Sequence, residues 1–171
     1  MRPMKKMAAV FLAAVMALAL LTACGGGGGG GNAGGGTAKP TGFTYEELTQ
    51  KINQNLTSTT FKYNEELQKK VAIEVTQKTG GQDVGRDVLL PIIDEVIEDQ
   101  NMGYGRPVAA SMGEESSKDV GRVAAALVKQ MQDNYYIDSD SSHIWKDAPI
   151  LYFVQKEAVG YTYYAVFIDN Q

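Results

Sequence analysis

The sequence predicts an α+β domain over residues 43–171, built as a three-layer α-β-α sandwich with about four helices and a small antiparallel sheet. Two observations support this fold class. Between residues 44 and 131, apolar side chains recur at helical spacing in four separate segments. Residues 149–155 and 161–168 read as strands that are apolar on both faces, so helices have to cover the sheet on both sides.

The first helix is predicted over residues 45–57. Thr44 is placed to cap it, and Glu47 completes a capping box three residues later. Phe43 can pack on Leu48 as a hydrophobic staple across the helix start. The apolar stripe of this helix consists of Tyr45, Leu48, Ile52 and Leu56.

Two further helices are predicted over residues 64–78 and 87–100. Asn64 is a suitable N-cap for the former, and Gly80-Gly81 ends it. Pro91 is predicted to fall in the first turn of the latter, where its missing N–H is harmless. The outer face of the latter helix is acidic, which is typical of a solvated surface; it carries Asp94, Glu95, Glu98 and Asp99.

The second half of the domain supplies the strands and the last helix. Residues 106–112 are predicted as a short strand, and Ser116 or Ser117 as the N-cap of a helix with several alanines. Residues 135–146 are predicted as a polar loop. A hairpin connection at residues 156–160 then joins the last two strands.

The first 23 residues have the pattern of a secretory signal peptide. Arg2, Lys5 and Lys6 form a basic start, and residues 7–21 are apolar and uncharged. This stretch is too short to span a bilayer core, which needs about 20 residues, and it matches the apolar region of a signal sequence. One interpretation is an ordinary signal sequence in which Cys24 follows by chance; the alternative is a lipoprotein signal.

Cys24 is the only cysteine in the chain and directly follows Leu21-Thr22-Ala23. This order resembles the lipobox of bacterial lipoprotein precursors, which implies cleavage before Cys24 and lipid attachment to its sulfur. Two or more acyl chains hold a protein stably on a membrane. The resemblance therefore implies a protein that is lipid-anchored to the cell membrane and faces the extracytoplasmic side, with the membrane as its partner through Cys24.

Residues 24–42 are predicted to form a disordered tether between this anchor and the domain. A glycine-rich linker of about a dozen residues has an r.m.s. span near 20 Å. A phosphate-binding loop does not fit, because the tract continues Gly36-Thr37-Ala38-Lys39-Pro40 and has no Gly-Lys-Ser/Thr after a strand.

Composition limits the chemistry of residues 43–171. They contain no cysteine, so neither a disulfide nor a thiolate nucleophile is available. The formal net charge of the chain is −4, and removal of Arg2, Lys5 and Lys6 with the signal lowers it to −7. Nucleic-acid binding needs clustered Lys and Arg, so nucleic acid is not an expected partner.

Five segments, taken in order, resemble the CAP (SCP) domains of the cysteine-rich secretory protein, antigen and pathogenesis-related superfamily. Residues 47–53 (ELTQKIN) and 61–67 (FKYNEEL) are similar to the family's first helix and the start of its second. Residues 120–131 resemble a later helix of the family, and residues 141–143 (SSH) resemble its Ser-x-x-His turn. Residues 161–167 (YTYYAVF) resemble its final aromatic strand. The family fold is an α-β-α sandwich.

The resemblance also implies what this chain lacks. Better-known CAP domains carry a cleft with two histidines and two acidic residues that sometimes binds a divalent metal, whereas this chain has one histidine, His143. The glutamate of the family's Gly-Glu-Asn strand has no counterpart near Gly105-Arg106-Pro107. A two-histidine metal site cannot be built, so no metal, no cofactor and no catalytic residue is expected, and His143 is the one candidate cleft residue.

The function expected from these observations is a non-enzymatic binding or interaction module, with an envelope protein or a small apolar ligand as partner. The alternative is a metal-dependent or hydrolytic module that uses His143 with nearby carboxylates such as Asp138 and Asp140. A calcium loop starting at Asp138 lacks the required Gly and Glu, and neither Ser111 nor Ser116 has an evident base. A mainly structural envelope protein is the third reading.

Overall fold

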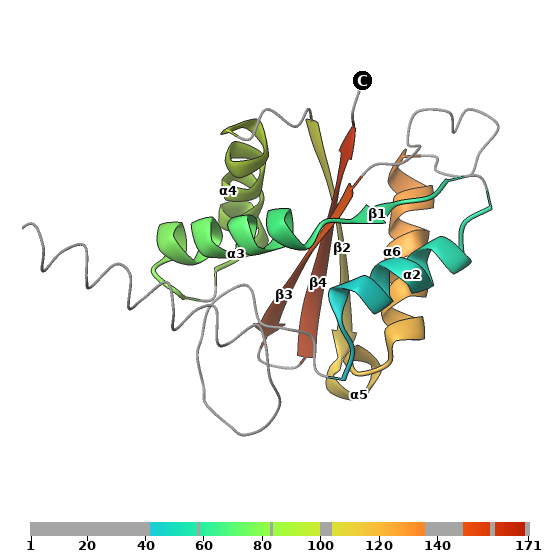
Figure 1. The fold of residues 1–171 in the computed structure, drawn as a ribbon. Helices are drawn as coiled ribbons and strands as arrows, with labels where there is room; N and C mark the ends of the chain where they lie inside the picture. Colours follow the sequence, from blue (N-terminus) through green and yellow to red (C-terminus); the bar gives the residue numbers. More distant parts are fainter. Residues whose placement is uncertain are drawn as a thin grey trace, which may run out of the picture. The chain divides into compact units, whose positions relative to one another are not determined.

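A computed structural model describes residues 42–57, 59–82, 84–99, 104–135, 149–157 and 160–169. All the described residues belong to one compact unit. Within that unit the elements follow in the order α2 (Tyr45–Gln54), β1 (Lys62–Tyr63), α3 (Glu65–Thr79), α4 (Arg86–Asp99), β2 (Tyr104–Gly113), α5 (Glu114–Ser117), α6 (Val120–Tyr135), β3 (Pro149–Glu157) and β4 (Gly160–Asp169) (Figure 1).

The sheet has the strand order β1-β3-β4-β2. The long strands β2, β4 and β3 pair antiparallel, as predicted, from Tyr104↔Asp169 to Gly113↔Gly160 and from Ile150↔Phe167 to Glu157↔Gly160. The sheet is nevertheless mixed, because β1 pairs parallel with the start of β3. Two residues are too few to show a period-two pattern, which is why the sequence did not predict β1.

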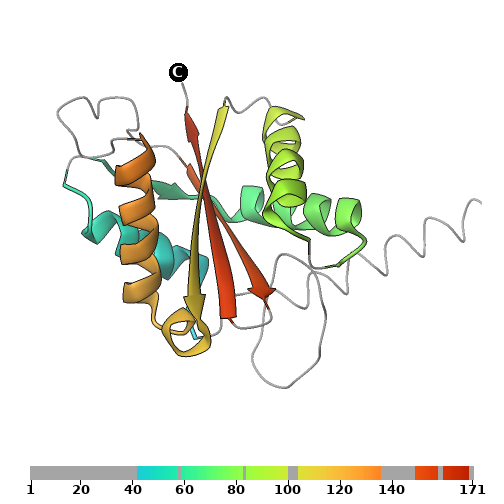
Figure 2. The same ribbon diagram turned by 180° about the vertical axis from the view of Figure 1, so that it is seen from behind.

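Helices cover both faces of the sheet, which confirms the three-layer sandwich. Figures 1 and 2 show α2 and α6 on one side of the strands and α3 and α4 on the other. Successive residues of β3 and β4 alternate between two separate hydrophobic cores, as the two-faced apolar pattern predicted. The core beside α2 and α6 takes Ile150, Tyr152, Val154, Tyr163, Ala165 and Phe167, and the core beside α3 and α4 takes Leu151, Phe153, Tyr164, Val166 and Ile168.

The predicted helix starts are confirmed for α2 and α3. Thr44 Oγ1 accepts from Glu47 N at 3.1 Å, and Glu47 Oε2 accepts from Thr44 N at 2.6 Å, which completes the capping box. Phe43 and Leu48 are both buried in the core beside α2. Asn64 Oδ1 accepts from the third backbone N–H of α3, and Gly80 ends that helix in the left-handed conformation with φ 64°.

Two other helix starts differ from the prediction. Pro91 lies inside α4 rather than in its first turn, because α4 begins at Arg86. Neither Ser116 nor Ser117 caps the long helix; both lie in the short helix α5. Asp119 starts α6 instead, with its carboxylate accepting from two backbone N–H groups at 2.9 and 3.1 Å. An aspartate is as good an N-cap as serine, so composition alone could not decide between them.

Two side-chain amides bind backbone N–H and C=O groups that no neighbouring strand pairs with. Asn53 at the end of α2 accepts from Phe61 N and donates to Phe61 O, both at 2.8 Å, which fixes the approach to β1. Gln68 in α3 donates to Tyr152 O at 2.8 Å and accepts from Tyr152 N at 2.9 Å. Since Tyr152 lies just past the β1 pairing, Gln68 continues the ladder on the outer edge of β3.

The ends of the sheet depend on close backbone contacts. A Cβ at Gly160 would collide with the Met112 carbonyl oxygen and lie 3.1 Å from its carbon, so only glycine fits there. At Gly113, its partner across the ladder, nothing lies within 4 Å of such a Cβ. Nearby, the Tyr163 hydroxyl donates to Ser117 O at 2.5 Å and so joins β4 to α5.

Candidate functional site

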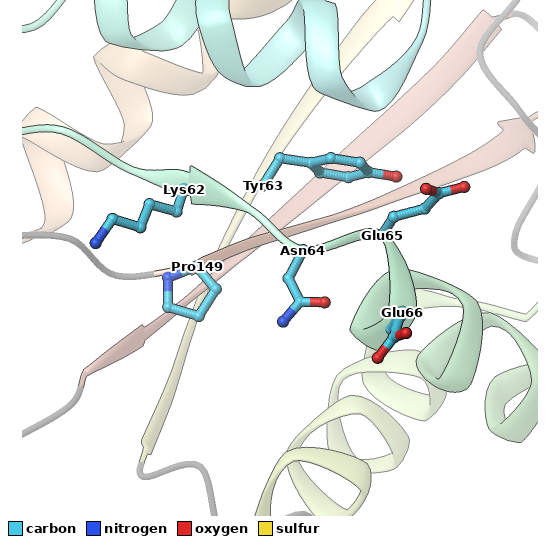
Figure 3. Close-up of a pocket in the computed structure, with 6 residues that line it drawn as sticks. All are labelled: Lys62, Tyr63, Asn64, Glu65, Glu66 and Pro149. Atoms are coloured by element: carbon cyan, nitrogen blue, oxygen red, sulfur yellow. The ribbon is translucent and has the colours of Figure 1, made fainter.

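The described residues contain an open groove where β1 meets the start of α3, here called the β1–α3 groove. Its volume is about 380 Å³, at the lower end of the range of small-molecule sites. Five of its six described lining residues carry side-chain groups that can bind a ligand through charge or hydrogen bonds. The groove is lined by Lys62, Tyr63, Asn64, Glu65, Glu66 and Pro149 (Figure 3).

Three backbone interactions hold these residues in place. The Asn53 amide binds both backbone groups of Phe61, the residue before β1. Lys62 then pairs in parallel register with Pro149, so residues far apart in the sequence form one wall. Asn64 caps α3 and thereby turns the chain from strand into helix. The groove is therefore built on regular elements rather than on a loop.

Alternation along the extended chain distributes the side chains. Tyr63 packs against the core beside α2 and α6, so Lys62 and Asn64 face the opposite side of the sheet. In Figure 3, the Asn64 amide and the Pro149 ring extend to the same side of the chain, and the Tyr63 ring extends away from them. Glu66 follows in the first turn of α3 and borders the same space.

The tyrosines behind the groove are structural. Tyr45 and Tyr152 stack with ring centroids 5.6 Å apart and an interplanar angle of 6°. Burial raises the pKa of Tyr152 well above its ordinary value, so its phenol is neutral at physiological pH. A neutral buried phenol is neither a base nor a nucleophile, and this ring serves to support β1 and β3 from the core side.

The residues singled out from the sequence fall mostly elsewhere. Cys24, His143, Asp138 and Asp140 lie outside the described residues, so lipid attachment and a His143 cleft stay predictions. Within the described ranges, no group of three or more His, Cys, Asp or Glu side chains could hold a metal ion.

The serine and acidic candidates of the described region have local partners. Ser111 Oγ lies 2.8 Å from Thr162 Oγ1, and a hydroxyl neighbour is not a general base. Glu114 and Glu115 both pair with Lys118, at 3.5 and 3.3 Å. Hydrogen bonding to Glu115, with the charges of both carboxylates, raises the pKa of Lys118. Glu114, Glu115 and Lys118 therefore form an ion-pair cluster on the surface.

The groove was not predicted as a site. The sequence did indicate Asn64 as the N-cap of α3. It did not indicate that Pro149 lies near Asn64, because this depends on the pairing of β1 with β3, and the two residues of β1 show no periodicity. A Lys-x-Asn-x-Glu pattern across a strand-to-helix junction is the one signal that could have suggested it.

Comparisons with known protein families, curated proteins and solved structures find no match to this chain. The likeness to CAP domains therefore stands on the sequence motifs alone. None of the helices in the described part of the chain is long and apolar enough to cross a membrane.

Proposed function

We propose that this chain is a membrane-tethered extracytoplasmic lipoprotein whose CAP-like domain acts as a non-enzymatic binding or interaction module. The signal pattern ending at Cys24 and the glycine-rich tether support the location. The α-β-α sandwich agrees with the fold that the CAP resemblance implies, although many unrelated functions share common folds.

The observation that carries the binding role is the β1–α3 groove. It combines a cation, an amide and two carboxylates where β1 passes into α3. These groups recognise a ligand by charge and hydrogen bonding. None of the described residues that line the groove is a serine, threonine or cysteine, and its lysine and glutamates serve binding as readily as catalysis.

Lipid attachment is tested by metabolic labelling with a fatty acid analogue in cells that express the wild-type chain or the Cys24→Ala variant. We expect label in the wild type and none in the variant, with the wild type in the membrane fraction. Equal labelling of the two proteins would exclude Cys24 as the anchor.

The binding role is tested against the metal-dependent or hydrolytic alternative. Zinc titration by calorimetry compares the wild type with His143→Ala. We expect no tight, saturable zinc binding in either protein. Tight zinc binding that His143→Ala abolishes would replace the binding module with a metal-dependent one.

A further inference from the structure

We propose that the open edge of β2 binds an extended peptide segment with basic side chains, which pairs with this strand and extends the sheet. The four-stranded sheet has the order β1-β3-β4-β2, so this edge lies opposite β1 and the β1–α3 groove. The edge of β2 is therefore a second surface, and what it binds is independent of the ligand of the groove.

The second half of β2 lacks the features that usually protect the edge of a sheet. β2 has ten residues and, in the described sheet, pairs only with β4. Proteins protect such an edge with charges, a proline or a covering segment, because its backbone groups pair readily with another chain. Arg106 and Pro107 lie in the first half of β2, whereas residues 108–113 (VAASMG) contain neither a charge nor a proline. Figure 2 shows β2 in front of the other strands, between α6 and α4, and no described element crosses it.

Alternation along β2 identifies the backbone groups that point away from the sheet. In an antiparallel pair, successive residues direct their N–H and C=O groups alternately towards the partner strand and away from it. A Cβ on Gly160 of β4 would collide with the Met112 carbonyl oxygen, which places that oxygen on the β4 side. Ala109 and Ser111 have the opposite parity, so their N–H and C=O groups point outward, and no described group outside the ladder binds them. Pro107 shares this parity, as expected for a proline in a sheet, whose missing N–H faces outward.

Helix α4 places an acidic stripe beside this edge. The Asp94 carboxylate lies over the start of β2, because its Oδ1 would be 3.3 Å from a Cβ on Gly105. Asp87 and Glu98 lie on the same face of the helix as Asp94, since their spacing matches the helical repeat. All three carboxylates are exposed, and none forms an ion pair with a described residue. Side chains that an added strand directs to the α4 face would therefore meet negative charge, which favours lysine and arginine.

A second copy of the chain fits this edge less well than a basic peptide does. Antiparallel pairing of Ala109 with Ser111 of a second β2 brings the Gly105 end of one strand beside the far end of the other. The acidic stripe of one copy would then approach Glu114 and Glu115 of the second copy, which directly follow β2. Juxtaposed like charges oppose such an association.

Amide hydrogen exchange, followed by NMR, tests the edge in the full chain carrying Cys24→Ala in mild detergent. In the free protein, we expect the amides of Ala109 and Ser111 to exchange faster than those of Val108 and Ala110, which point towards β4. Equally slow exchange of all four amides at every protein concentration would show that the edge is closed and would overturn the proposal.

The peptide probe is acetyl-Lys-Val-Lys-Val-Lys-Val-amide, whose lysines lie on one side of an extended chain and whose valines lie on the other. At a concentration of about ten times its Kd, it should slow exchange at Ala109 and Ser111 about tenfold. The same peptide with glutamate in place of lysine should give no protection at that concentration. Equal protection by the two peptides, or none by the basic one, overturns the proposal.

Variants of Ser111 test the backbone pairing. Ser111→Pro removes one outward N–H at a position where an edge strand tolerates proline, and it should weaken binding of the basic peptide about three- to tenfold. Ser111→Ala removes the hydroxyl but keeps the N–H, so it should bind like the wild type. Urea unfolding checks that both variants are folded. A folded Ser111→Pro protein that binds as tightly as Ser111→Ala would contradict pairing along β2.

Charge variants test the preference for a basic peptide and need no change in the strand. Asp94→Asn and Glu98→Gln should each weaken binding about two- to fivefold, as expected for the loss of one exposed charge pair. Glu46→Gln, an exposed carboxylate of α2 on the other face of the sheet, is the matched control and should have no effect. Equal weakening by Glu46→Gln would show that the acidic stripe does not select the ligand.

The same exchange data distinguish a peptide from a second copy of the chain. Protection of Ala109 and Ser111 that rises with protein concentration in the absence of peptide would show that two β2 strands pair, and would overturn the basic peptide as the occupant. Neither outcome changes the proposed role of the β1–α3 groove, because β1 lies at the other edge of the sheet.

Discussion

Replacing Gln68 by methionine tests whether a side-chain amide substitutes for a missing strand. Gln68 is buried, and it holds both the N–H and the C=O of Tyr152, at 2.9 and 2.8 Å. Methionine keeps the length of the side chain and removes both hydrogen bonds. The two backbone groups of Tyr152 then stay buried without partners.

Each buried polar group left unsatisfied costs about 1–3 kcal/mol, so the loss of both partners in Gln68→Met should destabilise the domain by about 2–6 kcal/mol. With a urea m-value of about 2 kcal/mol/M, the unfolding midpoint should fall by roughly 1–3 M. Far-UV circular dichroism in urea measures it, in the Cys24→Ala background. Gln77→Met, exposed on the same helix, is the control and should change stability by less than about 0.5 kcal/mol. A Gln68→Met effect no larger than this control would refute the reasoning.

Three further predictions use the same unfolding assay. Gly160→Ala should cost about 1–3 kcal/mol because its Cβ meets a backbone carbonyl of β2, whereas Gly113→Ala, in open space, should not; equal effects would contradict this. Tyr163→Phe should cost about 0.5–1.5 kcal/mol, because the hydrogen bond from the Tyr163 hydroxyl to Ser117 O of α5 is lost. Absorbance should show Tyr163 titrating with a pKa of about 12, because burial raises it; titration near 10 would show that its hydroxyl is accessible to solvent. Burial raises the pKa of Asp94, so its stabilising contribution is present below pH 3.8 and lost as pH rises through the folded pKa. Between pH 3 and 7, Asp94→Asn should remove this pH-dependent loss of unfolding free energy, and Glu98→Gln should retain it. The prediction would be contradicted if the wild type and Asp94→Asn had the same dependence of stability on pH.

Much of the fold could be predicted from the sequence because its signals are local. The Thr44 and Glu47 side chains cap α2 through atoms three residues apart, and Asn64 caps α3 in the same way. The alternating apolar residues of β3 and β4 fixed which side chain enters which core, and hence that helices lie on both faces. Such patterns need no knowledge of distant segments.

The parts that could not be predicted depend on contacts between distant residues. The strand β1 forms because Lys62 and Tyr63 pair with Pro149 and Ile150. Two residues are too few to show a pattern from which this strand could be predicted. Gln68 reads as an ordinary helical glutamine until Tyr152 is placed beside it. The groove could not be predicted for the same reason, since its walls come from β1, α3 and β3, which are distant in the sequence.

The way in which the chain enters the domain has a mechanical consequence. Phe43 is buried and stacks on Tyr163 with ring centroids 6.1 Å apart, directly before the Thr44 cap. Tension applied through the preceding residues would reach this ring, its contact with Tyr163 of β4 and the Thr44 cap first. A pull that removes Phe43 from the core is therefore expected to unfold the first turn of α2, while the backbone pairing of β2, β4 and β3 remains intact.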